Sequence, residues 1–240
     1  MIRTAMILAA GRGERMRPLS DAVPKPLIPV RGRALLDRIM DRLAEHGVRN
    51  IVVNVHHLGE QIATLLGGRA NIVREDRLLD TGGSLKNALP LLGDGPFFVL
   101  NGDGLWTDGP APMLGRLDAM WDPVRMDALL LLHPLATAIG GEPTDRGDYF
   151  LDPGERARHR GATDSAPYYF ASVSVCDRRL LHNAPEGPFS LVRLWHRAQA
   201  AGHLYGLVHD GSWFHVGTPR ALADAEAALA QPALAKAALT

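Results

Sequence analysis

The residues of this chain whose side chains could do chemistry are concentrated in three short segments. Residues 11–17 contain two glycines and three arginines, Lys25 stands between two prolines, and Asp103 ends the run Asn101-Gly102-Asp103. Glycine turns let backbone amides approach phosphate oxygens, and Arg and Lys neutralise phosphate charge. A carboxylate suits Mg²⁺, which usually takes one or two carboxylates together with phosphates and waters. The three segments therefore predict a polyphosphate site that uses Mg²⁺.

Short apolar runs stand directly before two of these segments. Residues 5–10 end at Gly11 and indicate a buried parallel strand, and residues 97–100 indicate a second one. In open α/β sheets, ligands bind beyond the carboxyl ends of the strands. We therefore expect the glycine-arginine segment and Asp103 to lie at the same edge of a sheet.

The rest of the chain alternates between strand and helix patterns. This alternation predicts an α/β fold, a Rossmann-like mixed and mostly parallel sheet with helices on both faces and a smaller strand-rich part. Helices are expected over residues 35–46, 58–66, 84–92, 191–201 and 219–230. Further strands are expected over residues 51–55, 71–74, 128–132, 149–151, 168–175 and 205–209.

The glycine-arginine segment departs from two well-known phosphate-binding loops. A Rossmann fingerprint needs a third glycine where Met16 stands, and a P-loop needs a different glycine spacing followed by Lys-Ser/Thr. A nicotinamide-dependent oxidoreductase is therefore a weak alternative. If the segment is considered alone, the other interpretation is a surface turn whose arginines face solvent.

Composition excludes several other classes of function. The 240 residues include 26 Lys and Arg and 26 Asp and Glu, so no broad basic surface for nucleic acid is expected. No apolar run approaches the length of a membrane span, and the N-terminus does not resemble a signal peptide. The single cysteine, Cys176, suits a reducing compartment and is expected in the core. We expect a cytoplasmic protein that binds neither nucleic acid nor membrane.

The run Leu8-Ala9-Ala10-Gly11-x-Gly13-x-Arg15, followed by Pro18 and by Pro24-Lys25-Pro26-Leu27, resembles the N-terminal signature of the sugar-1-phosphate nucleotidyltransferases. That family joins a nucleoside triphosphate to a sugar 1-phosphate and releases pyrophosphate. The resemblance implies that Arg15 holds the triphosphate, that Lys25 neutralises charge during transfer and that Asp103 binds Mg²⁺. The nucleotide-binding residues that it implies are Leu8, Ala10, Gly11, Gly13, Arg15 and Asn101.

The resemblance is strong over about the first 110 residues and weak over the rest. It implies one nucleotidyltransferase domain over residues 1–240. Residues 1–110 would be the nucleotide-binding half, and residues 111–240 the sugar-phosphate-binding half with a closing helix.

A second glycine pair, in Asp80-Thr81-Gly82-Gly83-Ser84, resembles the family's turn that approaches the nucleobase and ribose. Gly82 and Gly83 are therefore assigned to the nucleotide. They also stand where a helix is expected to begin, so a purely structural turn is the alternative.

One position departs from the family pattern. Trp213-Phe214-His215-Val216-Gly217-Thr218 resembles the family's Trp-x-Asp-x-Gly-Thr, whose aspartate is the second metal ligand. A neutral imidazole is a weaker ligand for Mg²⁺ than a carboxylate. The resemblance places the metal at Asp103, with His215 as a second and weaker candidate ligand. Four alternatives for the missing aspartate stay open: Asp103 holds the metal with phosphates and water, Asp210 compensates, His215 contacts phosphate, or His215 is structural.

The acceptor sugar is less clearly marked. The runs Asn101-Gly102-Asp103, Trp106-Thr107-Asp108 and Arg146-Gly147-Asp148-Tyr149 resemble the branch that acts on N-acetylmuramate 1-phosphate with UTP in cell-wall recycling. Arg146 and Asp148 are its candidate sugar-phosphate residues. Related branches share these short motifs and the family's Glu-Lys-Pro segment is not recognisable, so mannose- or heptose-1-phosphate guanylyltransferase remains an alternative. His215 motivates a further alternative, a catalytically impaired nucleotide-binding homologue. The sequence leaves the nucleobase, the sugar and the oligomeric state open.

Overall fold

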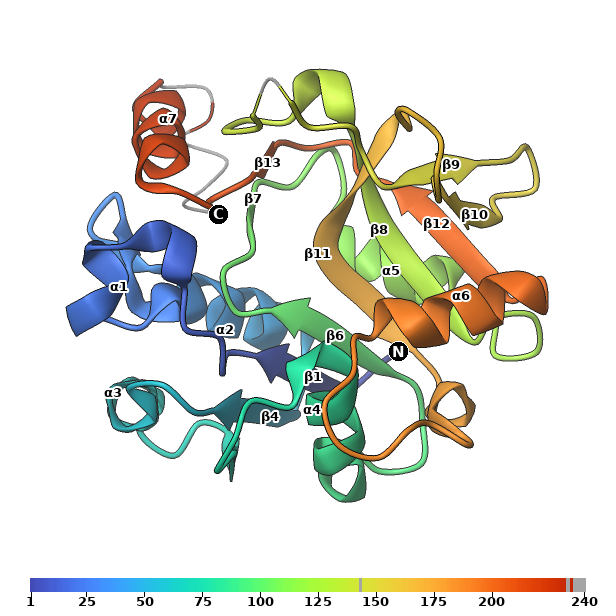
Figure 1. The fold of residues 1–240 in the computed structure, drawn as a ribbon, viewed down its shortest axis with the longest axis horizontal. Helices are drawn as coiled ribbons and strands as arrows, with labels where there is room; N and C mark the ends of the chain where they lie inside the picture. Colours follow the sequence, from blue (N-terminus) through green and yellow to red (C-terminus); the bar gives the residue numbers. More distant parts are fainter. Residues whose placement is uncertain (143, 232–233, 235–240) are drawn as a thin grey trace.

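A mixed sheet of nine strands runs through the part of the chain that the computed structural model describes (Figure 1). In the first half of the chain, β1 (Thr4–Leu8) lies between β4 (Asn50–Val55) and β6 (Phe97–Asn101), and β5 (Asn71–Arg74) pairs with β4. These four strands are parallel, and their apolar residues are covered on both faces. The structure describes residues 1–142, 144–231 and 234.

The sheet continues without a break into the second half of the chain. β11 (Tyr168–Cys176) is antiparallel to β6 and joins the two halves. On its other side β11 pairs with β8 (Ala128–Pro134), which is parallel to β12 (Leu204–Val208). The short strands β9 (Tyr149–Leu151) and β10 (Ala157–His159) extend the strand-rich part.

Helices cover both faces of the sheet, as the sequence predicted. Ala5 and Ile7 of β1 pack with α2 (Leu35–His46), α3 (Gly59–Leu66) and α5 (Met113–Met120). Met6, between them, packs with α4 (Asp80–Ala88) and α6 (Val192–Ala200) on the opposite face. This alternation follows from the two-residue period of a strand. Cys176 is buried in the second of these clusters.

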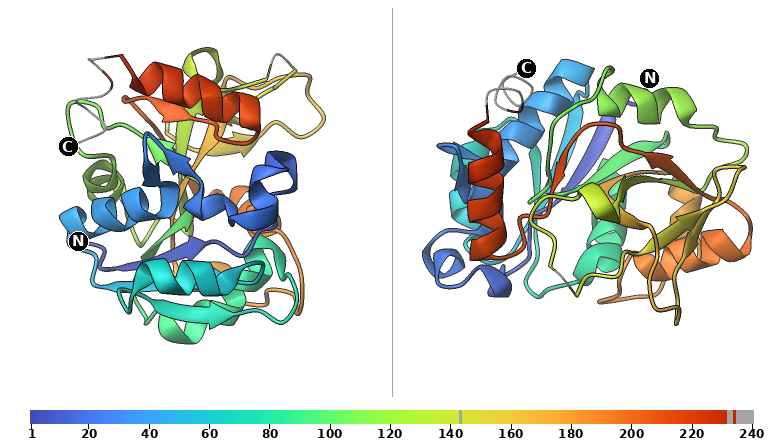
Figure 2. Two further views of the ribbon diagram at one scale, coloured as in Figure 1. Left: turned by 90° about the vertical axis from the view of Figure 1, so that its left-hand side faces the viewer. Right: turned by 90° about the horizontal axis from the view of Figure 1, so that it is seen from above.

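The C-terminal part of the chain returns to the first half. β13 (Trp213–Phe214) pairs with β7 (Leu105–Trp106), directly after the Asp103 segment. Helix α7 (Pro219–Leu229) then packs near the start of α2, against a small apolar cluster that includes Val30 and Leu35 (Figure 2). None of the helices within the described ranges is long and apolar enough to cross a bilayer.

Two helices differ from the sequence expectation, and the short strands β7, β10 and β13 were not predicted. Helix α4 begins at Asp80, so the expected turn at residues 80–83 is the first turn of the helix. Helix α5, which packs on the sheet through Met113, Leu114 and Leu117, was not predicted. In α4, Gly82 and Gly83 have low helix propensity, and their hydrogen bonds to the Phe189 carbonyl oxygen compensate for it.

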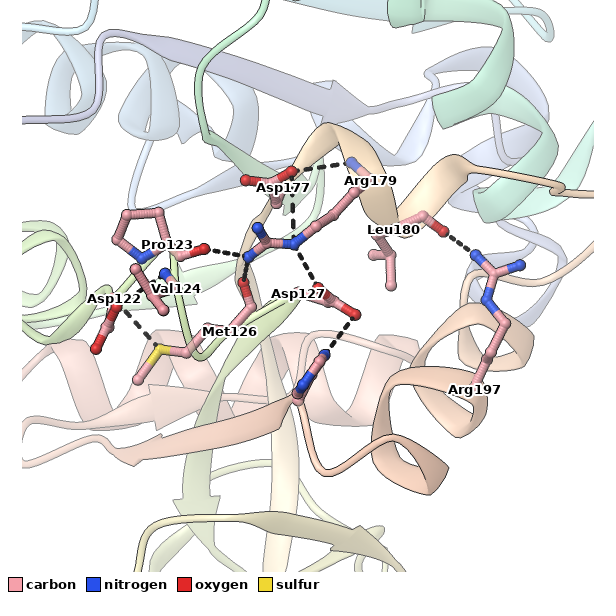
Figure 3. Close-up of polar contacts among 10 residues, drawn as sticks. Asp122, Pro123, Val124, Met126, Asp127, Asp177, Arg179, Leu180 and Arg197 are labelled. Atoms are coloured by element: carbon pink, nitrogen blue, oxygen red, sulfur yellow. Dashed lines mark hydrogen bonds and ion pairs between the residues drawn. The ribbon is translucent and has the colours of Figure 1, made fainter.

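A group of hydrogen bonds around Arg179 holds together the start of β8 and the end of β11 (Figure 3). Arg179 lies in the turn after β11, and its Nε is 2.5 Å from Oδ1 of Asp127. Its Nη2 donates to the carbonyl oxygens of Met126, at 2.6 Å, and of Pro123. His203 Nδ1 lies 3.2 Å from the other oxygen of Asp127. Arg179 and Asp127 together therefore connect three segments that support the strand-rich part.

Replacing Arg179 by Met should destabilise the fold by about 1–2 kcal/mol, because the methionine keeps the apolar stem and loses the charge-assisted hydrogen bonds. The expected decrease in Tm is about 2–8 °C for a chain of this length. Arg178→Met is the matched control, since both arginine side chains are 38% exposed but Arg178 pairs with a fully exposed Asp94. Equal Tm values for the two variants in thermal unfolding would contradict a structural role for this group of hydrogen bonds.

Candidate active site

A cavity of about 480 Å³ opens at the carboxyl ends of β1, β4 and β6. We call it the first cavity. The backbone of the glycine-arginine segment forms one wall, and the segment after β6 forms the floor. Seven residues proposed from the sequence lie in its lining: Leu8, Ala10, Gly11, Gly13, Lys25, Asn101 and Asp103.

Gly13 allows the loop after β1 to pack tightly against Lys25. Its φ is +64°, a conformation that favours glycine, and a Cβ at this position would lie 3.1 Å from Cβ of Lys25. The hydroxyl of Ser20 donates to the Gly13 carbonyl oxygen at 2.8 Å and holds the turn. The backbone of this loop is therefore fixed beside the lysine.

Lys25 and Asp103 form an ion pair across the floor of the cavity. Lys25 begins a short 3-10 turn and has prolines on both sides, which restrict its backbone. The amide of Gly102 donates to the Leu8 carbonyl oxygen at 2.8 Å, so the Asp103 segment is attached to the end of β1. The lysine side chain is 13% exposed and the aspartate side chain 30% exposed. Both charges are thus held in place and remain open to a ligand.

A second cavity, of about 260 Å³, adjoins the first and shares Lys25, Asn101 and Asp103 with it. Arg15 and His215 line this second cavity, which extends toward the strand-rich part of the fold. Two ligands bound side by side would therefore meet at Lys25 and Asp103. Arg15 was expected to hold the triphosphate, but it lines the second cavity and not the first.

The far wall of the second cavity carries polar groups that are held rigidly. The hydroxyl of Tyr169 donates to Oδ2 of Asp145 at 2.5 Å. Burial and the neighbouring Asp145 raise the pKa of Tyr169, so its phenol stays protonated. Asp148 accepts a hydrogen bond from the amide of Phe170 at 2.9 Å. These carboxylates are placed to accept hydrogen bonds from the hydroxyl groups of a sugar.

His215 is half-buried directly after β13, in the lining of the second cavity. Its amide donates to the Ile139 carbonyl oxygen at 2.7 Å, and its Nδ1 is buried with no hydrogen-bond partner in the described residues. Burial lowers the pKa of His215, and the charges of Arg15 and Lys25 lower it further against the opposing effect of Asp145. The imidazole is therefore neutral at pH 7.

The residues fit a magnesium ion held by a single carboxylate. No group of three or more His, Cys, Asp or Glu side chains able to hold a metal occurs in the described ranges. Asp103 already faces a cation, the ammonium group of Lys25, and a hard cation with phosphate and water ligands needs only one such carboxylate. The suggested compensation by Asp210 is not supported, because Asp210 pairs with Arg116 at 2.7 Å, outside the lining of both cavities.

Gly82 and Gly83 lie outside the lining of the first cavity, which differs from the sequence expectation. A Cβ on Gly82 would lie 2.3 Å from the ring of Phe189. The amides of Gly82 and Gly83 donate to the Phe189 carbonyl oxygen at 2.9 and 3.1 Å. The glycines therefore make room for the segment before α6, while Asp80, Thr81 and Ser84 line the cavity in their place.

Arg146 is also outside both cavities. Its side chain is 60% exposed, and it donates to the Asp164 carbonyl oxygen at 3.3 Å. Asp148, two positions further on, does line the second cavity. The tight turn at Gly147 directs the two side chains to different places.

The sequence reasoning missed a buried relay between Asn54 and Glu75. The amide of Ala9 donates to Oδ1 of Asn54 at 2.9 Å, and Nδ2 of Asn54 donates to Oε1 of Glu75 at 2.8 Å. The other Glu75 oxygen accepts from the amide of Leu79 at 3.3 Å, just before α4. Glu75 is only 6% exposed and directly follows β5. Asp103 was identified because it is a polar residue at the carboxyl end of a strand, and the same rule applies to Glu75.

Comparisons with known proteins identify the family to which this chain belongs. Residues 5–110 match the MobA-like NTP transferase domain, which defines the class as nucleotidyltransferase. N-acetylmuramate alpha-1-phosphate uridylyltransferase from Caulobacter vibrioides is 40% identical over 95% of this chain and 98% of its own length. The protein of the same name from Neisseria meningitidis is 33% identical over 93% and 96%. The chain belongs to the sugar-1-phosphate nucleotidyltransferase family.

Solved structures of the same fold have much lower sequence identity. The inositol-1-phosphate CTP transferase from T. maritima superposes with a TM-score of 0.72 at 20% identity, covering 94% of this chain and 96% of that one. A UDP-glucose pyrophosphorylase complexed with UDP-glucose gives a TM-score of 0.75 at 14% identity, covering 96% and 99%. These likenesses concern the fold alone.

Proposed function

We propose that this enzyme transfers the uridylyl group of UTP to N-acetylmuramate 1-phosphate, forming the UDP-sugar and pyrophosphate. The observation that carries the proposal is the pair of adjoining cavities that share Lys25, Asn101 and Asp103. The substrates are taken from the two relatives that match nearly the whole chain. The reaction would take place in the cytoplasm and serve cell-wall recycling.

In the proposed reaction, an oxygen of the sugar phosphate attacks the α-phosphorus of UTP. The new P–O bond forms as the bond to the bridging oxygen of pyrophosphate breaks, and pyrophosphate leaves. The sugar phosphate is already an anionic nucleophile, so positioning and charge neutralisation supply the rate. Lys25 and Arg15 provide fixed positive charge near the junction of the cavities. Asp103 would hold Mg²⁺, which when bound neutralises charge on the α-phosphate and aligns the reacting oxygens.

Each substrate has a natural place in this arrangement. The first cavity, with its glycine loop, suits the nucleotide, because backbone amides there can approach phosphates closely. The second cavity, with Asp145, Asp148 and Tyr169, suits a sugar with several hydroxyl groups. Arg146 has no place in this proposal, so the lactyl carboxylate of the sugar needs another cation, and Arg15 is the cation that lines the second cavity besides Lys25.

The test is a matrix of nucleoside triphosphates against sugar 1-phosphates, with pyrophosphate release as the readout and Mg²⁺ present. The highest kcat/KM is expected for UTP with N-acetylmuramate 1-phosphate. A preference for GTP with mannose or heptose 1-phosphate would replace the proposed substrates by those of the guanylyltransferase branch. Nucleotide binding without release in any pair would show a catalytically impaired homologue.

A further inference from the structure

Ser172 adopts a backbone conformation that is unusual for a residue with a side chain. It lies within β11, and its φ is +64°, in the left-handed region that glycine tolerates and other residues adopt at a cost. The pairing of β11 with β8 shifts register between Phe170 and Ser174, as it does at a β-bulge. Bulges often redirect a side chain beside an active site.

At this bulge Ser172 lines the second cavity. Val173 pairs with Leu100, so Ser172 lies beside the end of β6 that leads to Asp103. Its Cβ is 3.4 Å from the position that a Cβ on Gly104 would occupy. The serine is therefore next to the junction of the two cavities.

The hydroxyl of Ser172 has no hydrogen-bond partner among the described residues, although the residue is buried. Ser84, buried in the lining of the first cavity, likewise has no partner for its hydroxyl among the described residues, whereas two other buried serines have one. Ser20 donates to the Gly13 carbonyl oxygen, and Ser174 contacts Sγ of Cys176 at 3.8 Å. The Ser172 oxygen is not itself fully buried, since the buried side-chain atoms without a partner do not include it. It is therefore open to the cavity that Ser172 lines and is available to a ligand there.

We propose that Ser172 is a specificity-determining residue of the acceptor site, whose hydroxyl hydrogen-bonds a polar group of the sugar 1-phosphate close to its phosphate. This inference rests on the proposed function. Strained conformations persist where the surroundings or the function require them, and glycine would fill this position without strain. The serine adds a group that both donates and accepts to the cavity that Asp103, Asp145 and Asp148 also line.

The test compares Ser172→Gly with Ser172→Ala. Both remove the hydroxyl and should raise the KM for the sugar 1-phosphate about three- to tenfold, the effect of one lost hydrogen bond, with the KM for UTP unchanged. Only Ser172→Gly relieves the backbone strain, so it alone should raise Tm, by about 1–4 °C. A higher KM for the sugar 1-phosphate together with a higher Tm in Ser172→Gly would not be expected if Ser172 had only a structural role.

Glu155→Gly is the matched control. Glu155 has the same φ of +64°, but it is exposed in the turn between β9 and β10. Its replacement should raise Tm similarly and leave both KM values unchanged. A parallel rise in the acceptor KM in this control would overturn the assignment, because the kinetic change would then follow from backbone relaxation anywhere in the strand-rich part.

The outcomes separate this inference from the proposed function. If the wild type releases pyrophosphate but Ser172→Gly and Ser172→Ala keep its acceptor KM, the function stands and the role of Ser172 is wrong. If no substrate pair reacts, the proposed function fails. Calorimetric titration with N-acetylmuramate 1-phosphate then tests Ser172 directly in the wild type, Ser172→Gly and Ser172→Ala. Equal Kd values for the three proteins, or no binding to any of them, would refute the role of Ser172.

Discussion

Lys25→Ala and Asp103→Ala should each lower kcat for nucleotidyl transfer by about two orders of magnitude or more. This is the scale of losing one preorganised charge contact in an active site. Both side chains lie at the junction of the two cavities, where the reacting phosphates of two ligands would meet. The measurement is pyrophosphate release at saturating substrate concentrations. Asp94→Ala, at a fully exposed aspartate, is the control.

The two variants should respond differently to magnesium. Asp103→Ala should need more Mg²⁺ for half-maximal rate, because it loses the proposed protein ligand, whereas Lys25→Ala should not. The double variant should be little worse than the poorer single variant, since groups that act together give non-additive losses. Wild-type kcat in both single variants would refute the assignment of this ion pair to the reaction.

Asn54→Leu should have the second largest effect, on stability and on nucleotide binding together. The leucine removes the donor to a buried carboxylate and the acceptor of the Ala9 amide. Leaving Glu75 without this partner should cost about 2–4 kcal/mol, and Tm should fall by roughly 5–15 °C. The KM for UTP should rise, because the loop after β1 loses its attachment to β4. Thermal unfolding and steady-state kinetics measure the two effects.

A second substitution separates the two consequences of Asn54→Leu. Removing the carboxylate as well, in Asn54→Leu with Glu75→Leu, should restore part of the lost stability, since two apolar groups can replace a buried hydrogen-bonded pair at little cost. It should not restore the KM for UTP, because the Ala9 amide still lacks its acceptor. Recovery of both quantities would mean that the relay does not position the nucleotide loop.

Sequence reasoning worked best where one physical signal controls the local structure. The helix expected over residues 35–46 has these bounds in the structure, because apolar residues at a helical period precede a glycine that ends it. The loop after β1 and Asp103 were placed at one sheet edge by a rule that depends only on parallel strands. The same rule would have identified Glu75.

The remaining features depend on contacts between segments far apart in the sequence. Gly82 and Gly83 are helical because Phe189, more than 100 positions later, accepts their hydrogen bonds. The orientation of Ser172 follows from a register shift against β8, which leaves no mark in the sequence of β11. Arg146 and Asp148 are separated by a glycine with positive φ, so neighbours in one motif face different surroundings.

The common floor of the two cavities has a consequence for the end of the catalytic cycle. In the proposed reaction, the nucleotidyl group and the sugar phosphate enter on separate molecules and leave joined, while pyrophosphate leaves separately. The joined molecule keeps the contacts of the nucleotidyl group and of the sugar phosphate but loses its freedom of movement only once, so it should bind more tightly than the sugar 1-phosphate alone. Its departure, rather than bond formation, is then the natural candidate for the slowest step, and accumulating product would keep both reactants out at the same time.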